Sequence, residues 1–188
     1  PKIPLYAAAV GPNMSKVAGK LFNGIIIHRF STANYTRDVI LPSLRKGIHE
    51  SSLQQESNDI QVTGGGFIIM GATEAEVAAQ REQARGQIAW YASTRTYKRV
   101  MDHHGWGEVC LRLHRMSVEG QWSVMPLEIT DEMLDVFCIY GTYDKMAKKV
   151  WERYSNYATI ISLGMPASRK HDDKLGALLE ELSSGAPG

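Results

Sequence analysis

The residues best suited to chemistry lie directly after an apolar run near the start of the sequence. Residues 3–10, an apolar run with three alanines before Val10, are followed by Gly11, Pro12 and Asn13, where a helical pattern begins. The first turn of a helix carries unpaired N–H groups and about half a positive charge, which together attract an anion such as a phosphate. Gly11 permits close approach of the backbone, and Pro12 suits the first helical position. The pattern indicates a phosphate site, with an ordinary strand–helix turn as the alternative.

A second candidate pair, His28 and Arg29, stands near the end of the β-branched run 25–30. Side chains at this end of a strand point into the active-site mouth of a parallel α/β fold. We expect Arg29 to bind an anionic ligand, and His28 is the one residue that we nominate as a catalytic group. A pair that only faces solvent is the alternative.

Several aromatic residues gather in one helical stretch of the sequence: Trp90, Tyr91, Tyr97 and Trp106. They are suited to wall a flat apolar pocket or to form a small core of that stretch. No metal site is expected, because the histidines and the two cysteines show no ligand spacing. The sequence contains neither a serine elbow nor a P-loop lysine.

Composition narrows the classes of partner. The 188 residues are 44% hydrophobic and 22% charged with a net charge of +1, so no global field attracts nucleic acid or anionic lipid. No apolar run approaches the roughly 18–20 residues of a membrane span, and no signal peptide is recognised. We therefore expect a cytoplasmic location. The sequence starts at Pro1, a few residues before a strand that looks buried, which favours a fragment or a processed form.

Strand-like runs alternate with helical patterns along the chain. The four predicted strands are residues 3–10, 25–30, 60–71 and 158–164. Such alternation predicts right-handed βαβ units and a parallel sheet. Four strands in this order form either a small open sheet or half of an eight-stranded barrel.

The helices between these strands carry recognisable end signals. Thr32 or Asn34 is expected to cap a helix that reaches residue 50, and Pro42 to kink or tighten that helix. Thr73 and Glu76 form a capping box before a long helix. Thr142 is predicted to cap a later one, and residues 168–183 to form the last helix.

Two stretches do not fit the simple alternation. Residues 94–129 keep a broken helical pattern that is too long for one connection and predicts a helical insertion. Residues 132–139 form a short apolar segment. Within the third strand, Gly64–Gly66 marks a bulge or a close approach of the backbone.

Three segments resemble the luciferase-like monooxygenase superfamily. PLYAAAVGPNMSKVAGKLFNGIII is similar to that family's small-residue strand, Gly-Pro, Ala-Gly helix, Ala-Asp-Gly and apolar strand. FCIYGTYDKMAKKVWERY resembles its later GTP helix start, and GQIAWYASTRTYKRVMDHHGWG a segment of its coenzyme F420-dependent branch. Phe22-Asn23-Gly24 replaces Ala-Asp-Gly, and Tyr143 stands where Pro is usual.

The resemblance implies a (β/α)8 TIM barrel, which needs about 250 residues. This chain matches the C-terminal half, so the expected fold class is α/β, as strands five to eight. Residues 1–188 would then be a single partial domain with 94–129 as a helical insertion before the last strand.

The resemblance also implies the positions of the ligand-binding residues. It places a backbone loop around a deazaflavin or flavin near its phosphate, formed by Ala9, Val10, Gly11, Pro12 and Asn13. It places His28 and Arg29 at the pocket mouth, where family members contact the cofactor tail or the substrate.

The implied function is an oxidoreductase that binds coenzyme F420, with FMN as second choice. It would transfer hydride to or from a small organic substrate or insert oxygen into it. A non-catalytic flavin-binding or assembly protein built from a half barrel is the alternative. The open parallel edges of a half barrel pair readily, so the chain would form a homo-oligomer or associate with a missing N-terminal half. A small flavodoxin-like domain, expected to be a monomer, is the third interpretation.

Overall fold

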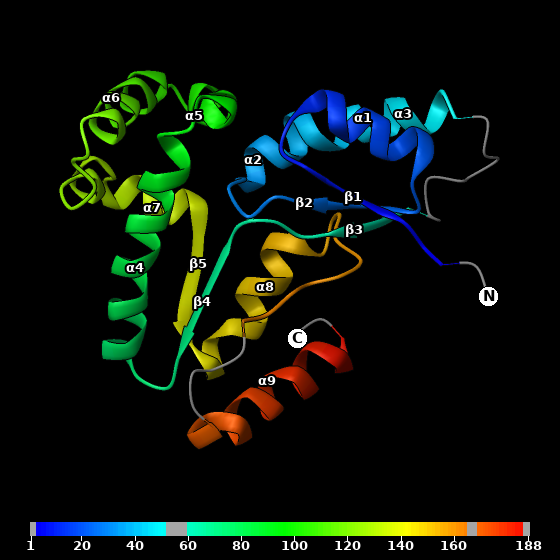
Figure 1. Cartoon of the computed structure of the whole chain (residues 1–188). Helices are drawn as coiled ribbons and strands as arrows, with labels where there is room; N and C mark the ends of the chain where they lie inside the picture. The colour runs from blue at the N-terminus through cyan, green and yellow to red at the C-terminus, as the bar shows by residue number, and fades with distance from the viewer. Residues whose placement is uncertain (1–2, 52–59, 165–168, 186–188) are drawn as a thin grey trace.

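Two parallel sheets organise the computed structural model, which describes residues 3–51, 60–164 and 169–185 (Figure 1). The first sheet contains β1 (Tyr6–Ala9), β2 (Gly24–Ile27) and β3 (Gln61–Thr63) in that order. The second pairs β4 (Phe67–Gly71) with β5 (Cys138–Thr142). All described pairings are parallel, which confirms the predicted α/β class with parallel strands.

Helices α1 (Pro12–Leu21) and α3 (Leu41–His49) lie side by side over the first sheet (Figure 1). Glycines allow this close crossing. A Cβ atom on Gly19 would overlap the carbonyl oxygen of Leu44, and one on Gly47 would overlap that of Lys16. The two backbones therefore touch directly and hold α1 in a fixed position relative to the strands.

The helix expected to end near residue 50 has three parts. Thr32 caps α2 (Ala33–Tyr35) by accepting a hydrogen bond from Tyr35 N–H at 3.1 Å, as predicted. A π-helical turn (Thr36–Ile40) then leads into α3. The local tightening expected at Pro42 is wrong: the helix instead widens in the π-helical turn directly before it, where the missing proline N–H leaves a carbonyl without its usual partner. The expected kink stays a prediction.

The remaining helices surround the second sheet. In Figure 1, α4 (Glu74–Ala92) lies on one side of β4 and β5 and α8 (Met146–Tyr154) on the other. Thr73 caps α4, and the Glu76 carboxylate accepts a hydrogen bond from Ala72 N–H at 2.8 Å. The other helices are α5 (Lys98–His103), α6 (Gly107–Val118), α7 (Asp131–Phe137) and α9 (Asp172–Ser184). Short 3-10 turns occupy Arg95–Tyr97, Met125–Glu128, Tyr143–Lys145 and Arg169–His171.

The predicted third strand, 60–71, is two strands in different sheets. Gly66 adopts a φ of 99°, which few other residues tolerate, and the chain changes direction there. At Gly65 a Cβ atom would lie 2.7 Å from the His28 carbonyl oxygen. The close backbone approach expected at Gly64–Gly66 is thus confirmed, and it ends the strand rather than only bulging it.

The C-terminal part corrects two further expectations. Residues 158–164 form no strand: only Ile160 bridges to Thr63, because the Thr159 side chain takes the Val62 N–H at 2.9 Å and ends the ladder. The apolar segment 132–139 is instead most of α7 and the start of β5. Thr142 precedes a 3-10 turn without a side-chain cap, and α8 begins only at Met146.

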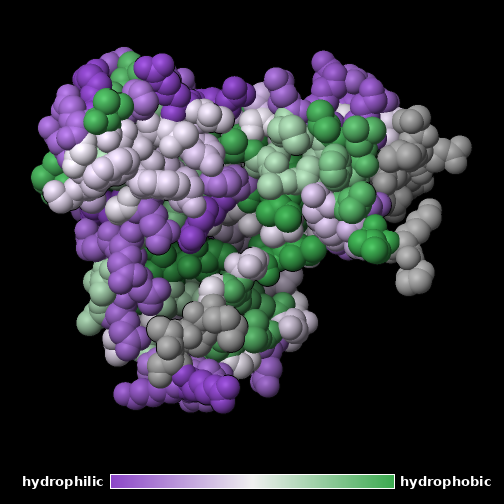
Figure 2. All heavy atoms as spheres, viewed as in Figure 1, coloured by the Kyte–Doolittle hydropathy of each residue, from purple (hydrophilic) through white to green (hydrophobic). Residues whose placement is uncertain are grey.

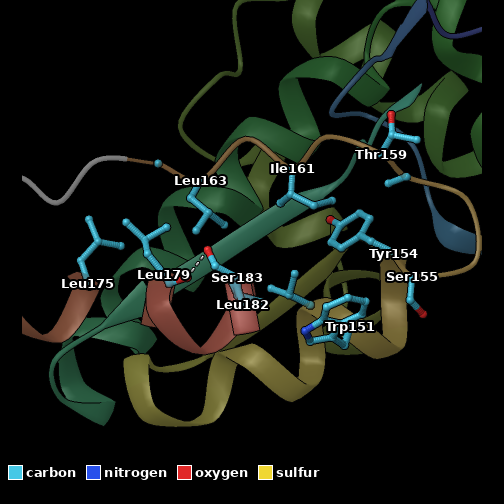
Figure 3. A pocket seen from close by; sticks show the side chains of 13 residues that line it. Trp151, Tyr154, Ser155, Thr159, Ile161, Leu163, Leu175, Leu179, Leu182 and Ser183 are labelled. Atoms are coloured by element: carbon cyan, nitrogen blue, oxygen red, sulfur yellow. Dashed lines mark hydrogen bonds between the residues drawn. The ribbon is translucent and has the colours of Figure 1, made fainter. Parts of the chain in front are cut away.

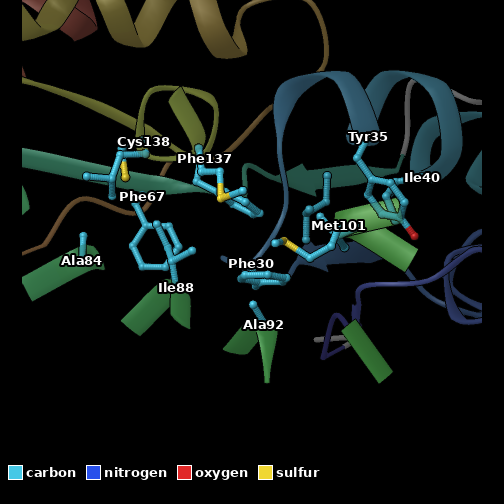
Figure 4. Close-up of a cluster of buried hydrophobic side chains, with 14 of the residues drawn as sticks. Phe30, Tyr35, Ile40, Phe67, Ala84, Ile88, Ala92, Met101, Phe137 and Cys138 are labelled. Atoms are coloured by element: carbon cyan, nitrogen blue, oxygen red, sulfur yellow. The ribbon is translucent and has the colours of Figure 1, made fainter. Parts of the chain in front are cut away.

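A core of aromatic and aliphatic side chains joins the two sheets (Figure 4). The rings of Phe30 and Phe137 stack with their centroids 4.7 Å apart, and Phe67 is likewise fully buried. A second cluster lies between α8 and α9 and includes Met146, Val150 and Leu178. In the part of the chain that the structure describes, no helix has the length and apolar character to cross a membrane.

One apolar surface remains uncovered at the β1 side of the first sheet. Met14, Val17 and Leu21 form an exposed stripe on α1, and Leu5 before β1 is 59% exposed. Figure 2 shows hydrophobic side chains gathered over α1 and β1. We refer to Leu5, Met14, Val17 and Leu21 below as the α1 stripe.

The helix crossing yields a first prediction. Gly47→Ala forces α1 and α3 apart, so we expect the free energy of unfolding to fall by about 1–3 kcal/mol. Gly176→Ala on α9, where a Cβ atom meets nothing within 4 Å, should instead raise it by about 0.5–1 kcal/mol. Urea denaturation followed by circular dichroism measures both, and equal stability of the two variants would contradict the tight crossing.

Candidate functional site

The N-terminus of α1 lies at the carboxyl end of β1, as the sequence predicts. Gly11 is extended (φ −128°, ψ 163°), and Pro12 occupies the start of the helix. The Ser15 N–H and hydroxyl both donate to the Gly11 carbonyl oxygen, at 3.1 and 2.9 Å. The N–H groups of Asn13 and Met14 have no acceptor among the described residues, so the first turn keeps two donors for a ligand.

A guanidinium group stands beside this helix end. A Cβ atom on Gly11 would lie 3.1 Å from Nη1 of Arg99, so the glycine makes room for that side chain. None of the ion pairs within the described residues involves Arg99. A helix N-terminus and a guanidinium without a carboxylate partner thus face the same small region.

Tyr35 connects the strand end to Arg99. Its hydroxyl donates to the Val10 carbonyl oxygen at 3.1 Å, and the ring is buried. Burial raises the pKa of Tyr35, while the charge of Arg99 and a hydrogen bond from it act in the opposite direction. The neighbour of the Arg99 guanidinium on this side is therefore a tyrosine hydroxyl rather than an acid.

Histidines at the end of α5 attach the insertion to the start of α2 and to the π-helical turn that follows it. His104 Nε2 lies 2.8 Å from Thr32 Oγ1, and His103 Nε2 lies 3.3 Å from the Asp38 carboxylate. The His104 ring also stacks on Trp106, with centroids 4.8 Å apart. These contacts explain why Arg99, one turn earlier on α5, reaches Gly11.

The strand that leads into the site offers little bulk. Ala7 and Ala9 are buried beneath the helices, whereas Ala8 is exposed and pairs in register with the exposed Ile26. The Ala8 side of the sheet is therefore open beside the helix N-terminus, with room for a flat group.

His28 lies one strand away. The backbone N–H of His28 donates to the Ala9 carbonyl oxygen at 2.9 Å. Its ring accepts a hydrogen bond at Nδ1 from Phe30 N–H at 3.1 Å, and Nε2 lies 3.3 Å from the Tyr97 hydroxyl. Burial, followed by the nearby Arg29 charge, lowers the pKa of His28 and favours the neutral ring.

Arg29 does not join His28 at the site. Its exposed guanidinium lies 4.4 Å over the Phe67 ring, a cation–π contact, while His28 turns toward Tyr97. No contact between Arg29 and Gly11 or Arg99 occurs within the described residues. The side chains of His28 and Arg29 therefore contact different residues, although the two positions are adjacent in sequence.

Two of the four aromatic residues, Tyr91 and Tyr97, pack around His28, and the expected wall of a flat apolar pocket stays a prediction. Tyr97 stacks on His28 with centroids 5.0 Å apart, and Tyr91 meets the same ring edge-on at 5.1 Å. Both also pack against the core through Phe30. Trp90 is instead 53% exposed.

Sequence reasoning missed Arg99 and Tyr35. Arg99 belongs to a short basic run in the predicted insertion, and spacing alone does not indicate which basic residue folds back to Gly11. Tyr35 follows the correctly predicted cap Thr32 by three residues, and its contact with Val10 is visible only in three dimensions.

A cavity of about 600 Å³ lies elsewhere, between α8, residues 158–164 and α9 (Figure 3). Leu163, Leu179 and Leu182 are among its apolar lining residues, and none of the predicted site residues lines it. No cluster of metal-ligating side chains occurs in residues 3–51, 60–164 and 169–185. The candidate site is therefore an open surface at the strand ends.

Fold and site together define a class: a parallel α/β chain with a helix N-terminus at the carboxyl end of a strand. The luciferase-like monooxygenase family model matches residues 1–159. The chain belongs to this family.

Relatives in the same family are about twice as long. The chain is 32% identical over 167 residues to an uncharacterized protein of Mycobacterium tuberculosis, covering 88% of this chain and 48% of that protein. It is 23% identical over 172 residues to the 5,10-methylenetetrahydromethanopterin reductase of Archaeoglobus fulgidus, covering 87% and 48%. The chain thus spans about half the length of the curated relatives it matches.

Solved structures show the same fold over the same fraction. The coenzyme F420 dependent tetrahydromethanopterin reductase from Methanopyrus kandleri aligns with a TM-score of 0.72 at 20% identity, covering 97% of this chain and 50% of that one. An F420-dependent secondary alcohol dehydrogenase, in complex with an F420-acetone adduct, aligns with a TM-score of 0.65 at 14% identity, covering 97% and 49%. The fold is that of half a luciferase-like barrel chain.

The environment of His28 predicts a pH dependence of stability. Because its pKa is lowered in the folded state, the unfolded chain takes up the proton first as the pH falls below about 6.5, and folding stability decreases there. Urea denaturation at pH 7.5 and 5.5 should show a smaller loss for His28→Gln than for the wild type. His49→Gln controls for the removal of one exposed imidazole, and equal losses in the wild type and His28→Gln would contradict the prediction.

Proposed function

We propose that this chain is the cofactor-phosphate-binding half of an oxidoreductase that uses coenzyme F420, with FMN as the second choice. The observation that carries the proposal is Arg99, a guanidinium without a carboxylate partner beside the N-terminus of α1. Two solved structures of the same fold, both named as F420-dependent enzymes, support this cofactor.

The residues present fit a phosphate at this position. The N–H groups of Asn13 and Met14 would donate to its oxygens, and Arg99 would add two charge-assisted hydrogen bonds. Gly11 has no Cβ atom to obstruct that approach. When bound, the cofactor would supply hydride transfer or oxygen chemistry, and the protein's part is to bind and orient it.

The open strand face beside this site would accommodate the flat part of the ligand. Ala8 offers no bulk there, and Ile26 supplies an apolar surface in register with it. The neighbouring His28 and Tyr97 rings would form one wall. The small organic substrate would approach from this open side, where the present chain provides only part of the pocket.

A catalytic role for His28 is less well supported than a positioning role. Both ring nitrogens have partners, Phe30 N–H and the Tyr97 hydroxyl, so neither is free to exchange a proton with a substrate. His28→Ala in the full-length enzyme tests the point: unchanged turnover would exclude catalysis by this residue.

We propose that this half is the C-terminal one, with strands five to eight of the barrel. The order of the Gly-Pro strand end, the Asn23-Gly24 turn and the later Gly141-Thr142 segment supports this assignment. The α1 stripe would then be covered by the preceding half of the barrel, since relatives have about the same length again. The non-catalytic half-barrel assembly remains the second candidate, favoured by the same uncovered stripe.

Mass measurement separates these two candidates. If a preceding half covers the stripe, the 188-residue chain should self-associate weakly, and Val17→Lys should abolish that association in sedimentation experiments. Thr96→Lys, at an exposed position outside the stripe, is the matched control. A stable particle of twice the 20.9 kDa chain mass would instead identify a second copy as the partner.

The phosphate site leads to a direct binding prediction. Arg99→Gln removes a charge-assisted contact, so the affinity for F420 should fall about 10- to 100-fold. Arg115→Gln, which removes the same charge from an exposed position on α6, should leave the affinity unchanged. Equilibrium dialysis with F420 and with FMN provides the dissociation constants. An unchanged affinity of Arg99→Gln for both cofactors would refute the phosphate anchor.

A further inference from the structure

The hydroxyl of Tyr97 is a polar group of the site with a single hydrogen-bond partner among the described residues, the ring of His28. Its oxygen lies 3.3 Å from His28 Nε2, and the described residues supply no other hydrogen bond to it. The direction of this single bond depends on which ring nitrogen of His28 carries the proton.

The other nitrogen of His28 decides that direction. Phe30 N–H donates to Nδ1 at 3.1 Å, so Nδ1 must present its lone pair. The ring is half-buried among aromatic neighbours, which favours its neutral form. A neutral ring with a lone pair on Nδ1 carries its proton on Nε2, and Nε2–H then donates to Tyr97. The Tyr97 hydroxyl proton is thereby left for another acceptor.

Packing restricts where this hydroxyl can point. The His28 and Tyr97 rings stack at an angle of 24°, and Tyr91 meets both of them edge-on, at 5.1 and 5.7 Å. Tyr97 is therefore held in one orientation at the surface of the site before any ligand arrives.

Tyr97 and Arg99 belong to one short stretch that faces neighbouring strand ends. Arg99 lies against Gly11 after β1, and Tyr97 contacts His28 after β2. Adjacent strands are about 4.8 Å apart, so both side chains are within reach of one small ligand. One offers a charge and the other a neutral hydroxyl donor.

We propose that Tyr97 donates a hydrogen bond to an uncharged oxygen, a carbonyl or a hydroxyl, of the same phosphorylated ligand that Arg99 binds. His28 is the positioning residue, because its Nε2–H occupies the tyrosine oxygen and directs the hydroxyl proton outward. The inference rests on the proposed function, since it takes the phosphate at Arg99 as the second anchor. The proposed ligand therefore carries a phosphate for Arg99 and an uncharged oxygen for Tyr97, at a fixed distance from each other.

Affinity measurements test the donor. Tyr97→Phe should weaken F420 or FMN binding about 2- to 12-fold, as expected for one neutral hydrogen bond, and leave the affinity for inorganic phosphate unchanged. Tyr157→Phe, a partly buried tyrosine outside the site, should leave both affinities unchanged. An equal loss for inorganic phosphate in Tyr97→Phe would place the hydroxyl on the anion and overturn the inference.

The positioning role of His28 has its own readouts. Nitrogen-15 NMR of the ligand-free chain should show the Nε2–H tautomer, and the opposite tautomer would overturn the inference. His28→Leu should weaken cofactor binding about as much as Tyr97→Phe, His28→Gln should restore most of that affinity, and His28→Leu should add nothing in the Tyr97→Phe background. A purely structural role would instead make the two losses additive.

The two proposals fail in different ways. If Arg99→Gln and Tyr97→Phe both leave the cofactor affinities unchanged, the phosphate anchor fails and the proposed function with it. If Arg99→Gln weakens binding and Tyr97→Phe does not, only the role of Tyr97 fails.

Discussion

The passage of the chain through Gly64, Gly65 and Gly66 is the constraint on which the arrangement of the two sheets depends. At Gly65 the backbone lies so close to the His28 carbonyl that no side chain fits, and the Tyr154 hydroxyl donates to the Gly65 carbonyl oxygen at 2.8 Å. Three glycines thus join the end of β2, the turn into the second sheet and helix α8 at one point. The orientation of His28, and through it that of Tyr97, follows from this contact.

The N-terminal third of the fold follows well from local sequence. Residues close together in sequence specify the first strands, the Gly11-Pro12 junction and the Thr32 cap. The structure contains each of these features. The C-terminal part does not follow in this way. Residues 138–142 form a strand because they pair with β4, whereas 158–164 lie beside β3, where the Thr159 side chain occupies the Val62 N–H and the pairing is limited to one bridge at Ile160.

Some residues of the candidate site can likewise be recognised from local sequence, and others cannot. Gly11, Pro12 and His28 are recognisable because strand ends and helix starts have characteristic residues. Arg99 and Tyr35 are not, because a contact between an insertion and a strand end depends on how the insertion docks. Arg29 shows the converse: it lies next to His28 in sequence, directly after β2, yet its guanidinium packs on the Phe67 ring, while the His28 ring lies against Tyr97.

The docking of α5 on the segment after β2 has a consequence for the order of events during synthesis. The hydrogen bond between His28 and Tyr97 spans 69 residues, and the one between His104 and Thr32 spans 72. The N-terminus of α1 leaves the ribosome before its guanidinium partner, which reaches it only after that long loop closes. Loop closure costs entropy before any contact repays it. A ligand that needs both would bind only chains that have completed this closure, and it would act as a selective stabiliser of the finished topology.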